Sequence, residues 1–259
     1  LTLFFPLDEN TGSIANDISG ANNNGGITNP SWTNGKINSA LSFNGASSYI
    51  QVPDNNSFSN IATPNLSISF WMFIPTTAPV VGNSNCGSAG AYLLSKGGGS
   101  YGGWEYGIEN DNNNRLCISF WQGSGTPQFT VNLPRTMNDN QWHYVGITYS
   151  YLIEAKVYID GVLVFTKTTG FVGSMINSTS PLFIGRRSDG NYFTGTLDEI
   201  RFYNRVISQA EITELYTGLE PAPTPVPTNT PIPTATSTPV PTPSVTSTPI
   251  PTAIPTNTP

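Results

Sequence analysis

A regular alternation of apolar side chains in one segment constrains the fold most. The residues that would share one face of an extended chain are Leu66, Ile68, Phe70, Met72 and Ile74. Successive side chains of a β-strand point to opposite faces, so this row predicts a strand that turns one face to a hydrophobic core. Similar short runs recur along most of the chain. The sequence therefore predicts an all-β fold.

The predicted strands are short and follow one another closely. They cover residues 2–5, 40–43, 49–52, 66–74, 91–95, 104–109, 116–121, 129–133, 142–149, 156–159, 162–167, 182–184 and 195–203. Asp160-Gly161 separates two of them and favours a type I′ hairpin turn. Asn- and Gly-rich segments at 22–26, 97–103, 110–114 and 170–173 are expected to be turns. Many short strands without helices between them predict an antiparallel sandwich or jelly roll.

One short helix is predicted at about 209–216. Ser208 and Glu211 form a capping box, Ile212 and Leu215 make an apolar stripe, and Gly218 ends the helix. A helix of this length cannot carry a fold. We expect it to close the β-domain.

The composition changes abruptly after the helix. Pro, Thr and Ser dominate the end of the chain, and Ser-Thr-Pro-Val-Pro-Thr at 237–242 is echoed at 247–252. Proline removes backbone donors and fixes φ, which predicts an extended polyproline II stalk. The predicted domains are 1–218 and 219–259. The stalk suits O-glycosylation, with candidates at Thr224, Thr228, Thr230, Thr234, Thr238, Thr242, Thr248 and Thr252. A plain interdomain linker is the alternative.

Charge and hydropathy exclude some classes of partner. Charged residues make up 10% of the chain, and its net charge is −6 with scattered Lys and Arg. An average soluble domain is ~25% charged, and nucleic-acid binding needs a basic stripe. No apolar run reaches the ~20 residues of a membrane span. A polar surface with few charges indicates an extracellular protein without nucleic-acid partners.

The cysteines Cys86 and Cys117 predict one disulfide. In an oxidising compartment it would stabilise the fold by roughly 3 to 4 kcal/mol in the chain-entropy model. Two buried thiols are the alternative. Cys86 stands in a Gly/Ser/Asn-rich segment, where a free thiol would be exposed, so the disulfide is favoured.

Several segments in order resemble laminin-G-like members of the concanavalin A-like lectin/glucanase superfamily. They include Leu-Phe-Phe-Pro-Leu-Asp-Glu at 3–9, Asp-Ile-Ser-Gly at 17–20, Ala-Leu-Ser-Phe-Asn-Gly at 40–45, Tyr-Ile-Gln-Val-Pro at 49–53, Leu-Ser-Ile-Ser-Phe-Trp at 66–71, Gln-Trp-His-Tyr-Val at 141–145, Tyr-Ile-Asp-Gly-Val at 158–162 and Gly-Thr-Leu-Asp-Glu-Ile-Arg-Phe-Tyr-Asn at 195–204. The resemblance implies a two-sheet antiparallel jelly roll over residues 1–218. Because this fold hosts lectins, adhesion modules and glycosidases, it does not specify a function.

No catalytic pattern is found. The superfamily's glycosidases carry Glu-x-Asp-x-Glu on one strand, but Glu105 and Glu109 have Gly107 between them. Asp198 and Glu199 are adjacent, which on a regular strand places them on opposite faces. His143 is expected to have a structural, hydrogen-bonded role. The sequence predicts that the protein is not an enzyme.

The resemblance also implies a structural Ca²⁺ near the first loops and the last long strand. Asp17 and Asp198 match those positions, with Asp8 as a supporter. The alternative is that Asp17 caps a turn and Asp198 pairs with Arg201.

Aromatic and planar polar residues in loops are the candidates for ligand binding. They are Trp104, Trp121, Arg186, Arg187, Asn191 and Tyr192. Trp71 and Trp142 are assigned to packing instead. The predicted function is an extracellular adhesion or carbohydrate-binding module on a stalk, with a glycan or a cell-surface protein as partner. The alternative is a subunit of a surface filament, in which copies of the chain assemble through the tail; a glycosidase comes third.

Overall fold

The computed structural model describes residues 1–55, 65–80, 90–97, 104–111, 113–121, 127–171 and 178–218. The chain separates into two units, Leu1–Pro221 and Ala222–Pro259. The stalk and all of its candidate glycosylation sites lie outside the described residues. No helix within the described residues is long and apolar enough to span a membrane.

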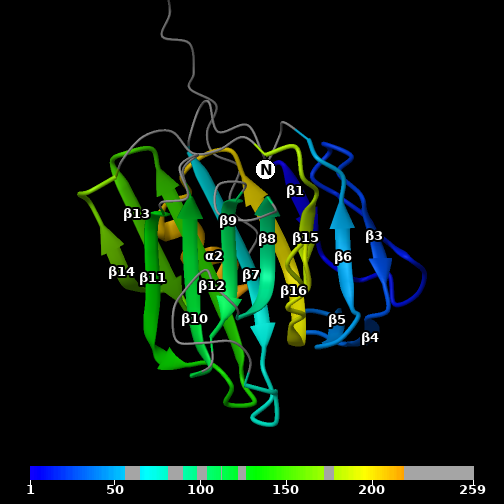
Figure 1. Ribbon diagram of the computed structural model, residues 1–259. Helices are drawn as coiled ribbons and strands as arrows, with labels where there is room; N and C mark the ends of the chain where they lie inside the picture. Colours follow the sequence, from blue (N-terminus) through cyan, green and yellow to red (C-terminus); the bar gives the residue numbers. More distant parts are fainter. Residues whose placement is uncertain are drawn as a thin grey trace, which may run out of the picture. The chain divides into compact units, whose positions relative to one another are not determined.

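The described residues of the first unit form two antiparallel sheets of eight strands each (Figure 1). Sheet I contains, in spatial order, β14 (Val162–Lys167), β13 (Glu154–Ile159), β12 (Trp142–Ser150), β7 (Leu66–Phe73), β16 (Thr194–Tyr203), β5 (Ser39–Asn44) and β4 (Ser31–Asn34), and β1 (Leu3–Phe5) also pairs with β16. Sheet II contains β11 (Pro127–Thr136), β10 (Arg115–Trp121), β9 (Trp104–Asn110), β8 (Ala91–Gly97), β15 (Leu182–Ile184), β6 (Tyr49–Val52), β3 (Gly25–Thr28) and β2 (Ile14–Ala15). The predicted two-sheet sandwich is confirmed.

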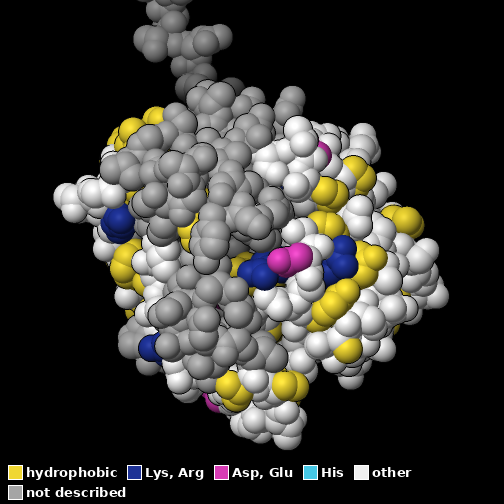
Figure 2. Space-filling view, in the orientation of Figure 1, with side chains coloured by type: hydrophobic (Ala, Val, Ile, Leu, Met, Phe, Trp, Pro, Cys, Tyr) yellow, Lys and Arg dark blue, Asp and Glu magenta, His cyan; other side chains and the backbone are white. Residues whose placement is uncertain are grey.

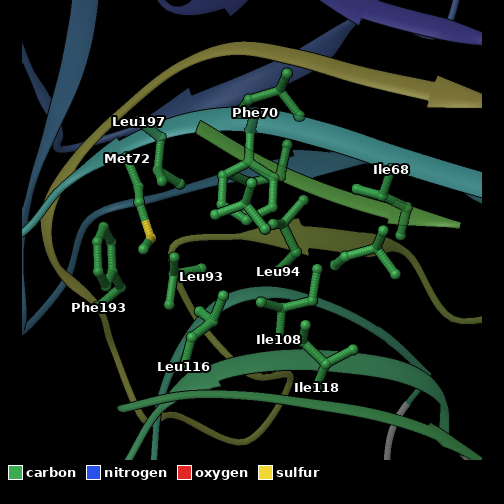
Figure 3. Packing of buried hydrophobic residues seen from close by; sticks show 14 of the residues in the cluster. Ile68, Phe70, Met72, Leu93, Leu94, Ile108, Leu116, Ile118, Phe193 and Leu197 are labelled. Atoms are coloured by element: carbon green, nitrogen blue, oxygen red, sulfur yellow. The ribbon is translucent and has the colours of Figure 1, made fainter. Parts of the chain in front are cut away.

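The hydrophobic core lies between the sheets. Ile68, Phe70 and Met72 of β7 are completely buried, which confirms the alternation read from the sequence. Figure 3 shows them opposite Leu94 of β8 and Ile108 of β9. Burying a side chain of this size contributes about 1.5 to 3 kcal/mol, so the core supplies much of the stability.

Part of the outer face of sheet I is buried as well, beneath the helix α2 (Gln209–Thr217). Trp71 projects from that face of β7, is only 3% exposed, and lies 5.4 Å from the ring of Tyr144 and 5.6 Å from that of Tyr216. The packing role assigned to Trp71 is therefore confirmed. The predicted caps are present too, since Ser208 and Glu211 form the capping box and Gly218 adopts a left-handed conformation.

Turn chemistry predicted one connection well and another badly. Asp160 and Gly161 have φ values of 52° and 77°, as a type I′ hairpin requires. The expected turn at 22–26 is wrong in part, because β3 begins at Gly25. A Cβ on Gly25 would lie 2.4 Å from Cγ2 of Ile50, so glycine serves here to let two strands approach closely.

Candidate functional site

The connection between β15 and β16 brings together the predicted ligand residues Arg186, Arg187, Asn191 and Tyr192. Arg187 and Gly190 exchange backbone hydrogen bonds of 2.8 and 3.1 Å, which close a tight turn. The carbonyl of Asn191 accepts a bond of 3.1 Å from the backbone N–H of Tyr92 in β8. Backbone pairing therefore holds this connection against sheet II.

Arg186 is held against aromatic rings. Its Cζ lies 4.0 Å from the ring centroid of Tyr49, 4.3 Å from that of Phe183 and 5.9 Å from that of Tyr192. Nη1 of Arg186 donates a 3.3 Å hydrogen bond to the Tyr192 hydroxyl. Tyr49 and Phe183 point away from the core because their neighbours Ile50 and Ile184 face it. The result is a half-buried guanidinium in an aromatic frame on the outer face of sheet II, and we call these four residues the Arg186 surface.

The Arg186 guanidinium differs from the other described arginine side chains in its charge balance. The others each pair with a carboxylate: Arg115 with Asp111, Arg187 with Asp189, Arg201 with Glu199 and Arg205 with Glu211. Within the described residues no ion pair is found for Arg186, and its Nε is buried without a hydrogen-bond acceptor. Figure 2, which views the molecule from the side of sheet II, shows basic and acidic side chains gathered on this face with hydrophobic side chains beside them.

Arg187 supports the turn rather than extending the Arg186 surface. Its guanidinium bonds the carboxylate of Asp189 at 2.5 and 3.0 Å and lies 5.4 Å from the ring of Tyr92. The Tyr92 ring fills the space above Gly107, where a Cβ would come within 2.8 Å of it. Burial raises the pKa of the Tyr92 hydroxyl, with a further contribution from the carboxylate of Glu109.

The predicted ligand residues Trp104 and Trp121 lie at the other end of sheet II. β9 pairs with β8 so that Trp104 is opposite Gly97, whereas Glu109 is opposite Tyr92. Phe183 of the Arg186 surface is opposite Ser95 of β8, and β8 lies between β15 and the strands β9 and β10 that carry the two tryptophans. Trp121 is half-buried, and the side chain of Trp104 lies outside the described residues.

Sequence reasoning missed Tyr49 and Phe183, and it also missed Gln51. Gln51 is exposed and lies directly opposite Phe183 in the pairing of β6 with β15. The signal was available in the alternation: Ile50 and Val52 face the core, so Tyr49 and Gln51 must face outward.

The candidate calcium ligands accept hydrogen bonds from N–H groups of the protein, several of them from distant segments of the chain. Asp17 accepts hydrogen bonds from the N–H groups of Phe4, Ser19 and Asn23. These bonds outweigh the effect of burial on its carboxyl and hold its pKa below the ordinary value, although burial is the largest single influence. Asp8 bonds Asn38 and Ser39.

Asp198 accepts a bond from the N–H of Ile37, and burial raises the pKa of its carboxyl to about 7. Across the described residues no group of three His, Cys, Asp or Glu side chains is placed to hold a metal ion. The described carboxylates therefore do not make a ligand set by themselves. Calcium binding stays a prediction, which equal melting temperatures in EDTA and in Ca²⁺ would exclude.

A β-bulge in β16 rearranges the carboxylates there. Leu197 and Ile200 both belong to the core cluster, and the register with β7 shifts between Asp198 and Arg201. Asp198 and Glu199 therefore both lie away from the core, and the prediction that they occupy opposite faces is wrong. Glu199 takes a φ of 54°, a left-handed conformation that a side chain of this kind seldom adopts.

The bulge places Glu199 against Arg201. The two side chains form an ion pair of 2.5 Å and are 5% and 8% exposed. The alternative pairing of Arg201 with Asp198 is therefore wrong. Cζ of Arg201 lies 3.8 Å from the ring centroid of Phe4. Both charges line a pocket of about 310 Å³ whose other walls include Ile18, Ile37 and Leu215.

His143 has the hydrogen-bonded role that was predicted for it. Its Nδ1 lies 2.8 Å from Oδ2 of Asp160, and its Nε2 lies 3.1 Å from the carboxylate oxygens of Asp139. The bond with Asp160 raises the pKa of this histidine, because it favours the protonated ring. The ring is 4% exposed, so it is closed off from a ligand.

Cys117 is fully buried in β10 and is not a free thiol. Its predicted partner Cys86 lies outside the described residues. The Cys86–Cys117 pairing stays a prediction.

The fold agrees with the comparison to protein families. Residues 44–213 match the family model described as the concanavalin A-like lectin/glucanases superfamily. The chain belongs to this superfamily, as its sequence motifs had indicated.

The similar proteins include a bacterial neurotoxin and two solved structures whose titles concern binding. Botulinum neurotoxin type F of Clostridium botulinum is 24% identical over 188 residues, which are 70% of this chain and 14% of the toxin. The binding domain of Paraclostridial Mosquitocidal Protein 1 superposes with a TM-score of 0.62 at 18% identity, covering 84% of this chain and 52% of that one.

A second structure has a title stating that cell entry of botulinum neurotoxin type C depends upon interaction with two ganglioside molecules. It superposes with a TM-score of 0.61 at 18% identity, covering 84% of this chain and 51% of that one. The chain thus spans about half the length of these two solved structures, and the likeness to them shows the fold alone.

Proposed function

We propose that this chain is a non-catalytic extracellular module that binds a glycan or a cell-surface protein. The superfamily supports a binding role, since its description names lectins beside glucanases. The titles of similar structures support the same class of partner, because one concerns interaction with gangliosides and another a complex with rat synaptotagmin II. An extracellular location follows from such partners and agrees with the low charge content of the chain.

The observation that carries the proposal is the Arg186 surface. Sugars bind proteins through stacking on aromatic faces and hydrogen bonds to planar polar groups. Tyr49 and Tyr192 are half-buried rings, Gln51 supplies an exposed amide, and Arg186 supplies a guanidinium. These groups lie on one outer face, which suits a polar ligand with apolar ring faces.

The state of the acidic residues supports a role without catalysis. A glycosidase needs two carboxyl groups ~5 to 9 Å apart in a cleft. Glu199 is neutralised by Arg201, Glu109 accepts a bond from the N–H of Gly90, and Asp198 is buried. These described carboxylates are bound to protein groups of their own.

The test is binding by the full chain and two matched variants. We expect wild-type protein to bind cells or a glycan array, and Tyr49→Ala combined with Tyr192→Ala to lose that binding. Trp121→Ala is the control, since it truncates a half-buried aromatic side chain at the other end of the same sheet. Loss of binding in Trp121→Ala alone would place the ligand-binding site near Trp121 instead of at the Arg186 surface. Equal binding by all three proteins would remove both surfaces from consideration.

A filament or coat subunit is a second candidate, favoured by the edge strand β14. Val162, Leu163 and Val164 are 63%, 43% and 45% exposed, and β14 ends the described order of sheet I. An exposed apolar edge strand can pair with the edge of another chain. Electron microscopy of the full chain would show fibres under this proposal. Val164→Lys should abolish the fibres if they form by pairing of β14 edges. Removal of residues 219–259 should abolish them if they form through the tail.

A further inference from the structure

We infer that Arg186 binds the carboxylate of an acidic sugar. The inference rests on the proposed glycan-binding function and names the chemical class of the ligand. It starts from the unbalanced charge of Arg186 in the Arg186 surface, and it concerns this residue only, not the neighbouring Arg187.

The hydrogen-bonding groups of Arg186 are largely unused. A guanidinium has five N–H donors in a fixed plane, and its geometry matches a carboxylate through two parallel bonds. Only the 3.3 Å bond to the Tyr192 hydroxyl is recorded for these donors within the described residues. The buried Nε has no acceptor there. The Arg186 side chain as a whole is half-buried, so an incoming anion can approach the guanidinium from the solvent side and accept bonds from donors that the protein leaves unused.

The aromatic frame orients the guanidinium before any ligand arrives. Tyr49 and Phe183 lie within 4.3 Å of its centre and Tyr192 within 5.9 Å. An arginine fixed in this way loses less conformational entropy on binding than a free surface side chain does. The tyrosine rings beside it offer the faces on which a sugar ring stacks.

The local charge favours a ligand with a single negative charge. Arg187 is neutralised by Asp189, and the Glu109 carboxylate beyond Tyr92 bonds the N–H of Gly90. Arg186 is then one unbalanced cation on a chain of net charge −6. A phosphate monoester carries about −1.5 to −2 near neutral pH and would require more cations than this surface provides. One carboxylate matches one guanidinium.

The experiment is calorimetric titration of the full chain with lactose, sialyllactose and sulfated lactose. We expect sialyllactose to bind at least about tenfold more tightly than lactose, as a charge-assisted bidentate contact would give. Arg186→Gln should reduce this preference to less than about twofold, and Arg186→Lys should keep part of it, because lysine retains the charge but loses the planar fork.

The matched control is the double variant Arg187→Gln with Asp189→Asn. It removes the neighbouring guanidinium and keeps the local net charge, so we expect it to preserve the preference for sialyllactose. If Arg186→Gln fails to fold, the Nε–H resonance of Arg186 in wild-type protein serves instead. It should shift on adding sialyllactose and stay in place with lactose.

Each contrary outcome has its own meaning. Equal affinity for lactose and sialyllactose overturns the acidic-sugar inference and leaves the proposed glycan function intact. A preference kept in Arg186→Gln but lost in the double variant places the anion on Arg187 and overturns the assignment. Tighter binding of sulfated lactose than of sialyllactose overturns the carboxylate assignment and makes a sulfate the preferred ligand group. Absence of binding to all three sugars, with cell binding preserved, rejects the inference and leaves the proposed binding function to a different glycan or a protein.

Discussion

Arg186 and Arg201 are both stacked on aromatic rings, but they differ in whether a carboxylate of the described residues balances their charge. Arg201 on sheet I lies over Phe4 and is neutralised by Glu199 at 2.5 Å. Arg186 on sheet II lies over Tyr49 and Phe183, and no carboxylate partner is found for it among the described residues. A stacked arginine is therefore a structural element where the protein supplies the counter-charge, and a candidate for binding where it does not.

The cause of the difference is what lies next to each arginine. A bulge in β16 brings Glu199 onto the face of Arg201, next to the region that α2 covers. The outer face of sheet II at β6 and β15 carries Gln51 and Tyr49 with no carboxylate beside them in the two strands. The following predictions test this contrast, from the largest expected effect to the smallest.

Removal of Glu199 should destabilise the protein most. Glu199→Ala removes the carboxylate that pairs with the buried Arg201 charge, which costs about 3 to 5 kcal/mol of unfolding free energy. Urea denaturation measures the loss. The double variant with Arg201→Leu is the control and should recover much of it, because it also removes the buried arginine charge. A loss in Glu199→Ala below about 1 kcal/mol would mean that Arg201 reaches water through the adjacent pocket.

The His143 cluster on sheet I should make stability depend on pH. The pKa of His143 is higher in the folded protein than its ordinary value of 6.5, chiefly through Asp160. Folding therefore favours the protonated ring, and its contribution is complete below the unfolded pKa and lost as pH rises through the folded pKa. Hydrogen bonds to charged groups contribute about 1.5 to 3 kcal/mol each, and this range limits the expected pH-dependent change in unfolding free energy.

Thermal unfolding of wild type and of His143→Gln from mildly acid to mildly alkaline pH measures this dependence. The difference between the two proteins isolates the histidine from other titrating groups. A constant difference across that range would contradict the assignment.

Loss of the α2 cap should loosen sheet I and leave sheet II unchanged. Ser208→Ala removes the side chain that accepts a hydrogen bond from the N–H of Glu211 and should cost about 1 kcal/mol. Hydrogen exchange should rise in α2 and around β16, and stay unchanged in β15. Thr213→Ala, at an exposed position in the middle of the helix, is the control and should show no such rise.

Replacement of Arg186 should have the smallest effect on stability. Arg186→Gln removes contacts with aromatic rings that are worth about 0.5 to 1 kcal/mol at exposed sites. Chemical denaturation should show this small loss, in contrast to the loss in ligand binding. A change as large as that of Glu199→Ala would make Arg186 a structural residue like Arg201.

Much of the fold could be predicted because its signals are local. The alternation around Phe70 follows from the period of a strand, and the Asp160-Gly161 turn follows from backbone preferences of two adjacent residues. The capping box of Ser208 and Glu211 likewise involves one turn of helix. Strands such as β3 were missed because Gly25 has a low strand preference, and only contact with Ile50 explains its place.

The candidate site was less predictable because it joins distant segments. Arg186 and Tyr192 could be selected from one short loop, but Tyr49 reaches the Arg186 surface from β6, far earlier in the chain. The sequence also contained no sign that Arg201 would pair with Glu199 instead of Asp198. That choice depends on the bulge in β16, which forms through the register with β7.

By itself, the sequence determined the all-β class, the capped helix and the superfamily motifs, since each arises from residues near one another in the chain. The tertiary structure decided which arginine is neutralised and which faces outward without a carboxylate partner among the described residues. Pairing of charges depends on distances of a few ångströms between side chains on different strands, and only the packing of the sheets establishes those distances.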